Sequence, residues 1–406
     1  MTVQLDPLRF LPLSFDCKVI NLYTIDEATL GVELDRTAFF PAGGGQSGDR
    51  GTLVPAGEPL SGDKADPVDC IVENVEIRPQ GVLHLVKNTA ENVKKLAPNT
   101  VLHAEIDRDK RFSDMQQHSG EHILSGVVCG RFGYTNVGFH LSEQEVTVDF
   151  DGVLTENDIC KVEDLVNEII WENRPIRVFF PTEEEKTQLI YRSKKEVDGP
   201  LRLVEIEGVD LCACCAPHVK TTGEVGALRI IKSEKNKGGT RLWILCGKRA
   251  LLDARQKLDQ NRQVSAMLSA KQSETAQAVR RLKEAHLALE YELVGMKRNL
   301  LQSQADAAPV QDVQFAVLDG DMDMLRFYAD RLAQKANRFA FVCTPGDDKK
   351  FILLTKTNED LRPVMQALRE HCNARGGGRD GVMQGSLSAT EEEIRRALDI
   401  VSVDSR

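Results

Sequence analysis

Short apolar stretches that alternate with polar residues dominate the first hundred residues. The segments 17–22, 31–34, 70–75 and 82–86 have the two-residue period of strands. Glycine, proline and other turn residues separate these segments. Closely spaced strands of this kind predict a small β-barrel-like domain over residues 1–100.

Helical and strand patterns are mixed between residues 101 and 247. From Asp107 to Val128 apolar residues recur at helical spacing, and Ser113 or a nearby Asp could cap the start of this helix. A second helix is predicted over about 156–173. The mixture predicts an α+β domain with helices packed on a sheet. The strand-like stretches are 138–141, 145–150, 176–180 and 201–206.

Residues 248–305 are rich in Ala, Leu, Gln, Lys, Arg and Glu and contain no proline. In the second half, apolar residues occupy two positions of a seven-residue repeat, although His286 interrupts one row. This pattern predicts a long helix or an antiparallel helical hairpin with a coiled-coil seam, through which the protein would form a homodimer. A helix packed along its own globular domain is the alternative. The two rows are Val279, Leu293 and Leu300, and Leu282, Leu289 and Met296.

Beyond Pro309, strands and amphipathic helices alternate again, which predicts a small α/β domain over residues 306–406. Its unusual feature is a glycine-rich loop predicted at 376–385, in which Arg379 could face a phosphate backbone. The predicted strands are 313–318, 339–343 and 350–355, and the predicted helices are 323–336, 360–371 and 390–400.

The composition limits the class of protein. A chain of 406 residues is too long for one ordinary core, and 41% hydrophobic with 28% charged residues is typical of a soluble globular protein. We expect no membrane association and a cytoplasmic location, because there is neither an apolar run of about 18 residues nor a signal-like start. The formal charge of -10 argues against coating nucleic acid by bulk electrostatics, although the basic stretch 232–237 could contact phosphates. The ten cysteines lack the spacing of a small disulfide-bonded domain, so we expect reduced thiols.

A glycine-rich stretch at 39–51 lies between predicted strands of the first domain. Three consecutive glycines precede Gln46 there, and glycine lets backbone amides approach a ligand closely. A surface turn is the alternative. The stretch has neither the strand–GxGxxG–helix context of a dinucleotide-binding fingerprint nor the GK[ST] ending of a phosphate loop.

Two pairs of potential metal ligands lie about a hundred residues apart. His118 and His122 are four residues apart on a predicted helix, so their rings project from the same face. Cys214 and His218 have the same separation. Either pair alone could be accidental, but sulfur and imidazole ligands in one predicted domain suit Zn²⁺. Cys214 is the preferred sulfur ligand because its spacing mirrors that of the histidines, and Cys215 is the second choice.

The histidine pair differs from the common zinc motifs. Its glutamate, Glu121, precedes the second histidine, whereas in the His-Glu-x-x-His of zinc proteases it follows the first. The two ligand pairs are also much farther apart than those of a zinc finger. An ion here would therefore join distant parts of one domain. The pattern leaves open whether that ion is structural or catalytic, and whether Cys212 takes part.

Several of these motifs occur in a fixed order together with further segments. They are 41–49 (PAGGGQSGD), His118-x3-His122, 204–210 (VEIEGVD), Cys214-x3-His218, 238–241 (GGTR) and 245–250 (LCGKRA). In this combination the chain resembles the stand-alone alanyl-tRNA editing proteins, relatives of the editing part of alanyl-tRNA synthetase. The helical segment and the stretch 376–385 resemble the carboxy-terminal region of the synthetase, so the resemblance covers nearly the whole chain.

The resemblance implies hydrolysis, in trans, of the ester that joins serine, or in many members glycine, to tRNA(Ala). Carried over to this sequence, it implies that His118, His122, Cys214 and His218 hold zinc. The carboxy-terminal domain would help to hold the tRNA, and there we expect contacts from Gly376, Gly377, Gly378 and Arg379. The expected substrate-binding residues are Gly43, Gly44, Gly45, Gln46, His140 and Thr147. Of these, the last three could recognise a serine hydroxyl through a polar group that alanine leaves unpaired.

Two positions depart from the family pattern. Ala216 and Pro217 stand where many relatives have Gly-Thr, so the backbone there can differ. Ala42 stands where some relatives have a hydroxyl that could read serine, which leaves serine discrimination open. Two alternative functions also stay open: a zinc hydrolase of another ester or amide, and a tRNA-binding module whose zinc is structural and which hydrolyses nothing.

Overall fold

The chain divides into two compact units, Met1–Gln260 and Asn261–Arg406, and helix α5 (Gly247–Met267) crosses the boundary between them. A computed structural model describes residues 2–6, 10–57, 70–193, 200–357, 359–379 and 381–403. None of the helices in these ranges is long and apolar enough to span a membrane. The predicted division into four domains stays a prediction.

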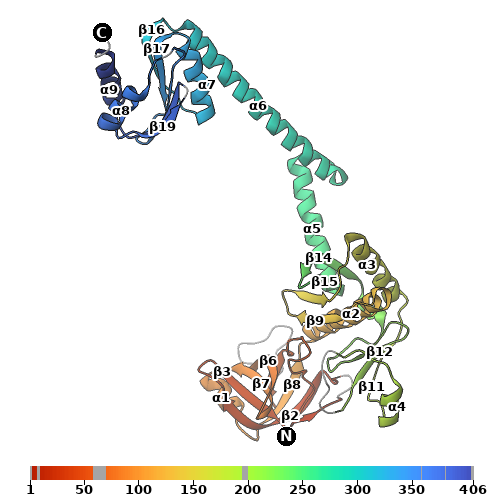
Figure 1. Cartoon of the computed structure of the whole chain (residues 1–406). Coiled ribbons are helices and arrows are strands. Elements are labelled where there is room, and N and C mark those ends of the chain that lie inside the picture. Colours follow the sequence, from red (N-terminus) through yellow and green to blue (C-terminus); the bar gives the residue numbers. More distant parts are fainter. Residues whose placement is uncertain are drawn as a thin grey trace. The chain divides into compact units, whose positions relative to one another are not determined.

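A closed six-stranded barrel opens the first unit and confirms the predicted barrel (Figure 1). The strand order is β2-β3-β7-β6-β5-β8, and neighbouring strands are antiparallel. Alternation along β2 places Phe15, Cys17 and Val19 in the barrel core. Two strands, β5 and β8, were not predicted. The barrel strands are β2 (Ser14–Thr24), β3 (Thr29–Leu34), β5 (Gly51–Pro55), β6 (Cys70–Arg78), β7 (Gly81–Lys87) and β8 (Val101–Ile106), accompanied by β1 (Val3–Gln4), β4 (Arg36–Thr37) and α1 (Ala90–Lys95).

The rest of the first unit packs helices against two antiparallel sheets, as the mixed pattern predicted. One sheet has the order β14-β15-β10-β9, and the other has the order β11-β12-β13. The hairpin β14–β15 was missed by the sequence reasoning. The elements are α2 (Arg108–Phe132), β9 (Asn136–Leu141), β10 (Val146–Phe150), α3 (Glu156–Trp171), β11 (Ile176–Phe179), α4 (Glu183–Gln188), β12 (Leu203–Ile206), β13 (Asp210–Ala213), η1 (Thr222–Val225), β14 (Leu228–Asn236) and β15 (Gly239–Cys246).

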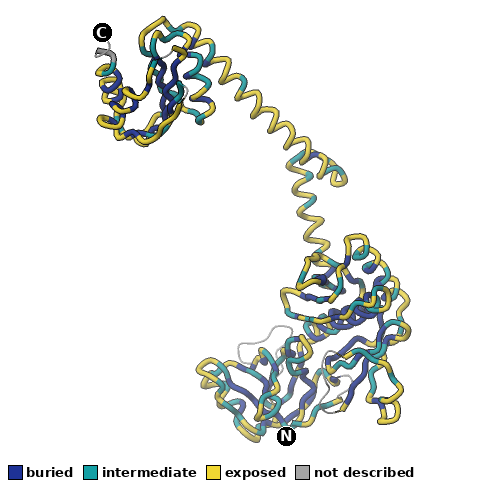
Figure 2. The backbone as a smooth tube through the Cα atoms, in the orientation of Figure 1, coloured by how far each residue is buried: buried dark blue, intermediate teal, exposed yellow. Residues whose placement is uncertain are grey.

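Helix α2 is the central element of this part and is buried on nearly all sides between residues 116 and 126 (Figure 2). Its glycines allow this: a Cβ on Gly120 would lie 2.3 Å from Cys246 Sγ, and one on Gly126 would lie 2.4 Å from the carbonyl oxygen of Val209. Gln117 donates to the carbonyl of Cys246 at 3.0 Å and accepts from its amide at 2.7 Å. The helix that carries both histidines is therefore held rigidly against β15.

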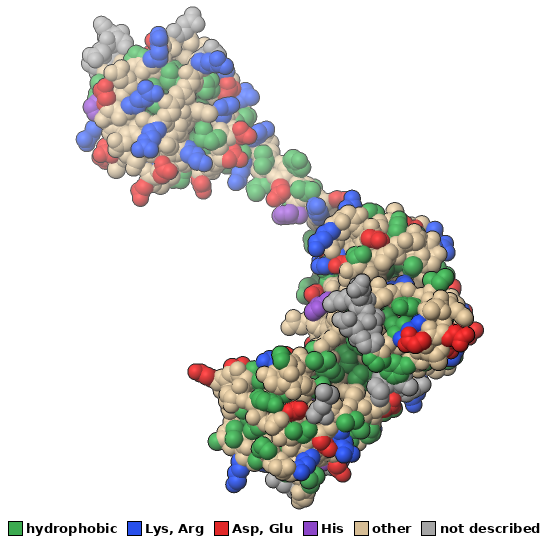
Figure 3. Space-filling model, turned by 60° about the horizontal axis from the view of Figure 1, so that its bottom comes forward, with side chains coloured by type: hydrophobic (Ala, Val, Ile, Leu, Met, Phe, Trp, Pro, Cys, Tyr) green, Lys and Arg blue, Asp and Glu red, His purple; other side chains and the backbone are tan. Residues whose placement is uncertain are grey.

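Two helices form the predicted helical segment. Helix α5 ends at Met267, and a short 3₁₀ turn η2 (Gln272–Glu274) and helix α6 (Thr275–Ala307) follow within the second unit. The apolar residues of both seven-residue rows are 48% to 63% exposed, and Figure 3 shows hydrophobic side chains on the surface of this segment. The coiled-coil seam thus has no partner within the described chain, and it stays a prediction.

The second unit is a five-stranded sheet with helices on both faces, in agreement with the predicted α/β domain. The order is β16-β17-β18-β20-β19; β16 and β17 are parallel and the other pairs are antiparallel. Along β17, Phe339 and Phe341 face the helices α8 and α9, whereas Ala340 and Val342 face α7 and the end of α6. The elements are β16 (Gln311–Val317), α7 (Met322–Ala333), β17 (Ala336–Cys343), β18 (Lys349–Leu354), α8 (Arg362–Cys372), β19 (Arg375–Arg379), β20 (Val382–Leu387) and α9 (Glu391–Val403).

The prediction of a glycine-rich loop at 376–385 was wrong. Most of this stretch forms the antiparallel strands β19 and β20, and Asp380 lies outside the described residues. The glycines allow the two strands to approach closely, since a Cβ on Gly376 would lie 2.2 Å from the carbonyl oxygen of Gln384. Gly376, Gly377, Gly378 and Arg379 therefore lie on an exposed edge strand.

Candidate metal centre

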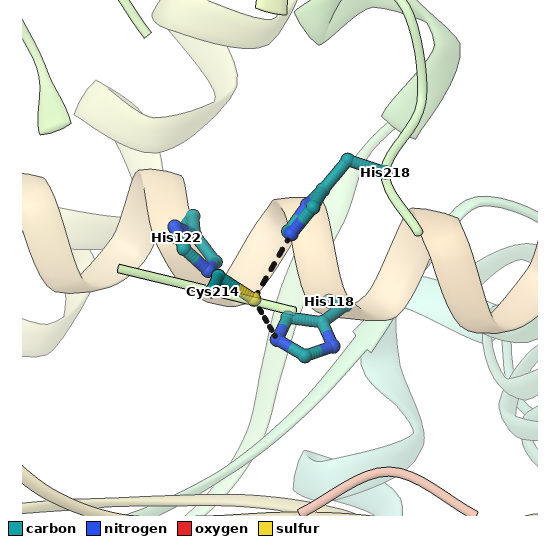
Figure 4. A group of neighbouring side chains, drawn as sticks. All are labelled: His118, His122, Cys214 and His218. Atoms are coloured by element: carbon teal, nitrogen blue, oxygen red, sulfur yellow. Dashed lines mark hydrogen bonds between the residues drawn. The ribbon is translucent and has the colours of Figure 1, made fainter. Parts of the chain in front are cut away.

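The four predicted metal ligands meet at one place in the first unit (Figure 4). Helix α2 provides His118 and His122, and the segment after β13 provides Cys214 and His218. One ligand atom of each residue lies within 4.8 Å of the others. Cys214 Sγ is 3.5 Å from His118 Nε2 and 3.3 Å from His218 Nε2. Residues about a hundred positions apart in the sequence thus form a single cluster.

Each histidine of the cluster is oriented by a contact at its other ring nitrogen. The partners are Gln46 Oε1 (2.8 Å from His118 Nδ1), Asp210 Oδ2 (2.9 Å from His122 Nδ1) and Ser119 Oγ (3.1 Å from His218 Nδ1). An amide or carboxylate oxygen can only accept, so Nδ1 carries the proton at least in His118 and His122. Their Nε2 atoms then direct a lone pair at the centre of the cluster, as metal-binding histidines do.

The separations fit a tetrahedral metal ion. With Zn–N bonds of about 2.0 Å and Zn–S bonds of about 2.3 Å, neighbouring nitrogen and sulfur ligands of a tetrahedron lie about 3.5 Å apart. The two observed separations between sulfur and nitrogen, 3.5 Å and 3.3 Å, agree with this value. The residues present therefore fit a zinc ion in both chemistry and geometry.

The surroundings favour the ligand forms of two residues. Burial alone would raise the pKa of the Cys214 thiol, but the neighbouring imidazoles of His118 and His218 hold that pKa well below its usual value, which favours the metal-binding thiolate. Burial lowers the pKa of His218 to about 3, which keeps its imidazole neutral. Burial alone would also lower the pKa of His122, but its hydrogen bond with Asp210 raises the pKa well above its ordinary value. A proton therefore competes with a metal ion for His122.

Asp210 connects this cluster to a second positive group. Arg192 donates to both of its carboxylate oxygens, at 2.6 Å and 2.8 Å, while His122 donates to one of them. Cys212 forms a second group of potential ligands with His122 and Asp210. Burial raises the pKa of the Cys212 thiol, in contrast to Cys214, so its sulfur is less suited to bind a metal.

A pocket of about 530 Å³ opens beside the cluster. The glycine-rich stretch forms part of its wall, because Gly44 and Gly45 line it together with Phe139 of β9. The amide of Leu141 donates to the carbonyl of Gly45 at 2.7 Å, which holds the stretch against β9. The Phe139 ring centre is 4.8 Å from that of His118, so an aromatic surface adjoins the metal ligands.

The chain has recognisable relatives. The family model of the threonyl and alanyl tRNA synthetase second additional domain matches residues 201–242, and that of the DHHA1 domain matches residues 311–402. Alanyl-tRNA editing protein AlaX-L of Pyrococcus horikoshii is 24% identical over 93% of this chain and 93% of its own length. Alanyl-tRNA editing protein Aarsd1 of Rattus norvegicus is 25% identical, covering 92% and 89%.

Over most of its length, the chain is a homologue of the alanyl-tRNA editing proteins. Alanine–tRNA ligase of Pyrococcus furiosus is 28% identical over 80% of this chain, but the match covers only 35% of the ligase. The match at 201–242 includes Cys214 and His218, and the DHHA1 match spans the sheet of the second unit. The homology therefore covers both the candidate metal centre and the carboxy-terminal sheet.

In the present chain, the structure brings together some of the predicted substrate-binding residues. Gly44 and Gly45 line the pocket, Gln46 contacts His118, and Gly43 pairs with Gln46 through two backbone hydrogen bonds of 3.0 Å. His140 and Thr147 instead face each other across β9 and β10, and neither is among the described residues that line the pocket. A role for the latter pair in substrate recognition stays a prediction.

Residues that support the cluster were not assigned a role from the sequence. Ser119 and Glu121 lie inside the motif itself, so a helical projection could have placed both near the ligands. Asp210 was noted only as part of a motif. Arg192 has no local signal, because it reaches Asp210 through a bridge to Cys212 that exists only in the folded sheet.

Proposed function

We propose that this protein is a trans-editing hydrolase that cleaves the ester between serine and tRNA(Ala), with glycine as a further substrate, at a zinc site. His118, His122, Cys214 and His218 hold the Zn²⁺ ion in this proposal. The carrying observation is the cluster of three imidazoles and one thiolate at the wall of a pocket. Its occurrence in a homologue of the alanyl-tRNA editing proteins identifies the ester as the bond to be cleaved.

A zinc ion bound here would supply Lewis acidity, which polarises a carbonyl or makes a nearby water a better nucleophile. The protein itself contributes rigid positioning. Gln46, Asp210 and Ser119 hold the ligands, and α2 cannot shift because it is buried on nearly all sides. An aminoacyl ester is already activated, so positioning and a few aligned dipoles account for a large part of the rate.

Gln46 is the candidate for distinguishing serine from alanine in this proposal, because it contacts His118 at the wall of the pocket. Its side chain is 3% exposed, its Oε1 accepts from His118, and its Nε2 is buried without a hydrogen-bond partner in the described part of the chain. A buried donor of this kind costs free energy until an oxygen accepts from it. We assign that acceptor to the serine hydroxyl, because alanine would leave the amide unpaired.

The second unit holds the tRNA in this proposal. All five residues of β19 are exposed at the edge of the sheet, and they include Gly376, Gly377, Gly378 and Arg379. An edge strand of glycines presents its backbone amides without obstruction by side chains, and the arginine can pair with a phosphate. The RNA backbone is therefore the expected partner of this edge.

We further propose that α6 forms a homodimer through the two apolar rows of residues 279–300 and that the protein acts in the cytoplasm. A seven-residue repeat of half-exposed apolar side chains is stabilised when a second helix covers it. The partner expected for such a repeat is the same helix of a second copy. Light scattering of the full-length protein tests this, and a monomer at micromolar concentration contradicts it.

Hydrolysis of Ser-tRNA(Ala) by wild type and by His118→Ala tests the function, with thermal melts and zinc content measured on the same samples. We expect wild type to hydrolyse the ester and the variant to lose at least 100-fold in rate while remaining folded. His103→Ala, which alters a histidine of barrel strand β8 that contacts Asp16 outside the pocket, is the matched control.

The other outcomes identify the alternative functions. A wild type that binds Ser-tRNA(Ala) without hydrolysing it, together with an unfolded His118→Ala, indicates a tRNA-binding module with structural zinc. A full-length protein that hydrolyses another ester but not Ser-tRNA(Ala), and whose activity on that ester is unchanged by truncation after Ala250, indicates a hydrolase of another ester or amide.

A further inference from the structure

The pocket contains a carboxylate to which no role has been assigned above. Glu121 precedes His122 on α2, and its side chain is only 2% exposed, yet it lines the pocket. Burying a carboxylate costs several kcal/mol, on the order of the whole stability of a small domain, unless polar partners compensate. A carboxylate buried at this place therefore depends on specific polar partners.

Two side chains fix the orientation of this carboxylate. Ser125, one helical turn later, donates to Glu121 Oε1 at 2.7 Å, and Asn136 of β9 donates to the same oxygen. Asn136 also donates to Ser125 Oγ at 2.9 Å, so the three residues form a closed group. With Oε1 held in this way, Oε2 lies 3.9 Å from His122 Nε2, the nitrogen directed at the metal cluster.

The order His-x-x-Glu-His is the reverse of the His-Glu-x-x-His motif and also occurs in zinc peptidases. In His-Glu-x-x-His enzymes the two histidines bind zinc and the glutamate is the general base. Here the glutamate is again beside a metal-binding histidine, with one oxygen anchored and the other next to the ligand nitrogen. The geometry thus places an oriented carboxylate beside a metal-binding histidine at the wall of the pocket.

We propose, on the basis of the proposed function, that Glu121 Oε2 takes the proton of the water that attacks the ester. The water oxygen bonds to the carbonyl carbon as its proton moves to Oε2. The bond from that carbon to the ribose oxygen then breaks, and the ribose oxygen receives the proton from Glu121. The products are free serine and a tRNA with its terminal hydroxyl restored, and Glu121 is again ionised.

Glu121→Gln is the informative substitution, because the amide oxygen can still accept from Ser125 and Asn136 while the atom in place of Oε2 becomes a donor. Glu163→Gln is the matched control: Glu163 is a carboxylate of α3 that pairs with Arg229 at 3.0 Å, outside the pocket. Wild type and both variants are purified at full length, and the zinc content of each is measured.

Two further measurements separate binding from chemistry. The Kd of each protein is measured for Ser-tRNA(Ala) in which an amide replaces the ester, and kcat is measured with the ester itself. We expect Glu121→Gln to keep one zinc per chain and a Kd within about twofold of wild type, while kcat falls about 100-fold or more. Glu163→Gln should remain within about twofold of wild type in all three quantities.

Three results would overturn this role. A Glu121→Gln variant with kcat within about threefold of wild type shows that another group takes the proton. Loss of zinc, or a Kd that rises as much as kcat falls, shows that Glu121 supports the metal site or binds substrate instead. A wild type no faster than buffer overturns the proposed function, and with it this inference, whereas the first two results leave the proposed function intact.

Discussion

Gly45→Ala is expected to damage the metal centre although Gly45 is not itself one of the potential ligands. A Cβ on Gly45 would lie 2.4 Å from the carbonyl oxygen of Phe139, whereas side-chain carbons are essentially never found within 3.0 Å of such an atom. The glycine-rich stretch and β9 must therefore separate by at least 0.6 Å. Gln46 is the next residue and would move with the stretch, away from His118.

The size of the effect follows from two separate costs. The φ of Gly45 is +86°, so any side chain there costs about 1–2 kcal/mol of backbone strain. Displacing Gln46 also weakens its 2.8 Å hydrogen bond with His118 Nδ1. Loss of such a supporting contact lowers metal affinity or activity by about 10–100-fold, equal to about 1.4–2.8 kcal/mol.

Gly133→Ala isolates the backbone strain. Gly133 ends the same helix, α2, with a φ of +70°, and a Cβ there would meet nothing within 4 Å. Zinc affinity, measured by competition with a chelator, should fall about 10–100-fold in Gly45→Ala and remain within about threefold of wild type in Gly133→Ala. Thermal unfolding should show a loss in both variants. Equal zinc affinities in the two variants would refute the reasoning.

Three further predictions follow from other parts of the structure. Burial lowers the pKa of His84 to about 4, below its value of about 6.5 in the unfolded chain. Between these two pH values the unfolded chain binds a proton that the folded protein does not. The contribution of the neutral His84 to the free energy of unfolding is therefore fully present above pH 6.5 and is lost as the pH falls toward 4. Between pH 7 and pH 5 we expect the free energy of unfolding of wild type, measured with urea, to fall by about 2 kcal/mol. It should fall much less in His84→Gln, and equal decreases in the two proteins contradict this prediction. Asp210→Asn keeps the shape of the side chain that accepts from His122 but removes its negative charge. We expect the Kd for zinc, measured by metal titration, to rise about 10–100-fold, and an unchanged Kd would disprove this. Leu293→Lys places a charge in one of the two apolar rows of α6, which are half exposed in the single chain. Light scattering should then show a monomer in place of a dimer, and the melting temperatures of the two units should not fall. A variant that stays dimeric rules out these rows as the dimer interface.

Local pattern was sufficient for much of the fold. Two-residue alternation identified four of the six barrel strands, and helical spacing identified α2 and α3. The sequence left the cap of α2 open between Ser113 and a nearby Asp, and the structure places it at Asp107, whose side chain accepts from the amide of Lys110. The missed hairpin β14–β15 has an edge strand with mostly exposed residues, so β14 lacks the buried alternation on which strand prediction depends.

The glycines of 376–385 show the limit of composition as evidence. Glycine permits a loop, but it equally permits two strands to approach closely, and the local sequence does not separate these cases. Pairing of β20 with β18 favours the strand, because β18 is itself paired with β17 inside the sheet. The conformation of the stretch 376–385 therefore depends on strand pairing with residues distant in the sequence, which local sequence patterns do not reveal.

The sequence alone determined the chemistry of the site, because ligand type and helical spacing are local properties. His118 and His122 were identifiable as a pair from their separation, and Cys214 and His218 from theirs. Their combination also predicted one shared centre, which the structure bears out. Only the tertiary structure decided which residues orient the ligands and which carboxylate lies beside them. These facts depend on contacts such as that of Gln46 with His118, across 72 positions of the chain, and on the sheet that brings Asp210 to His122. Such contacts form only when burial of the core fixes the backbone, so no local pattern contains them.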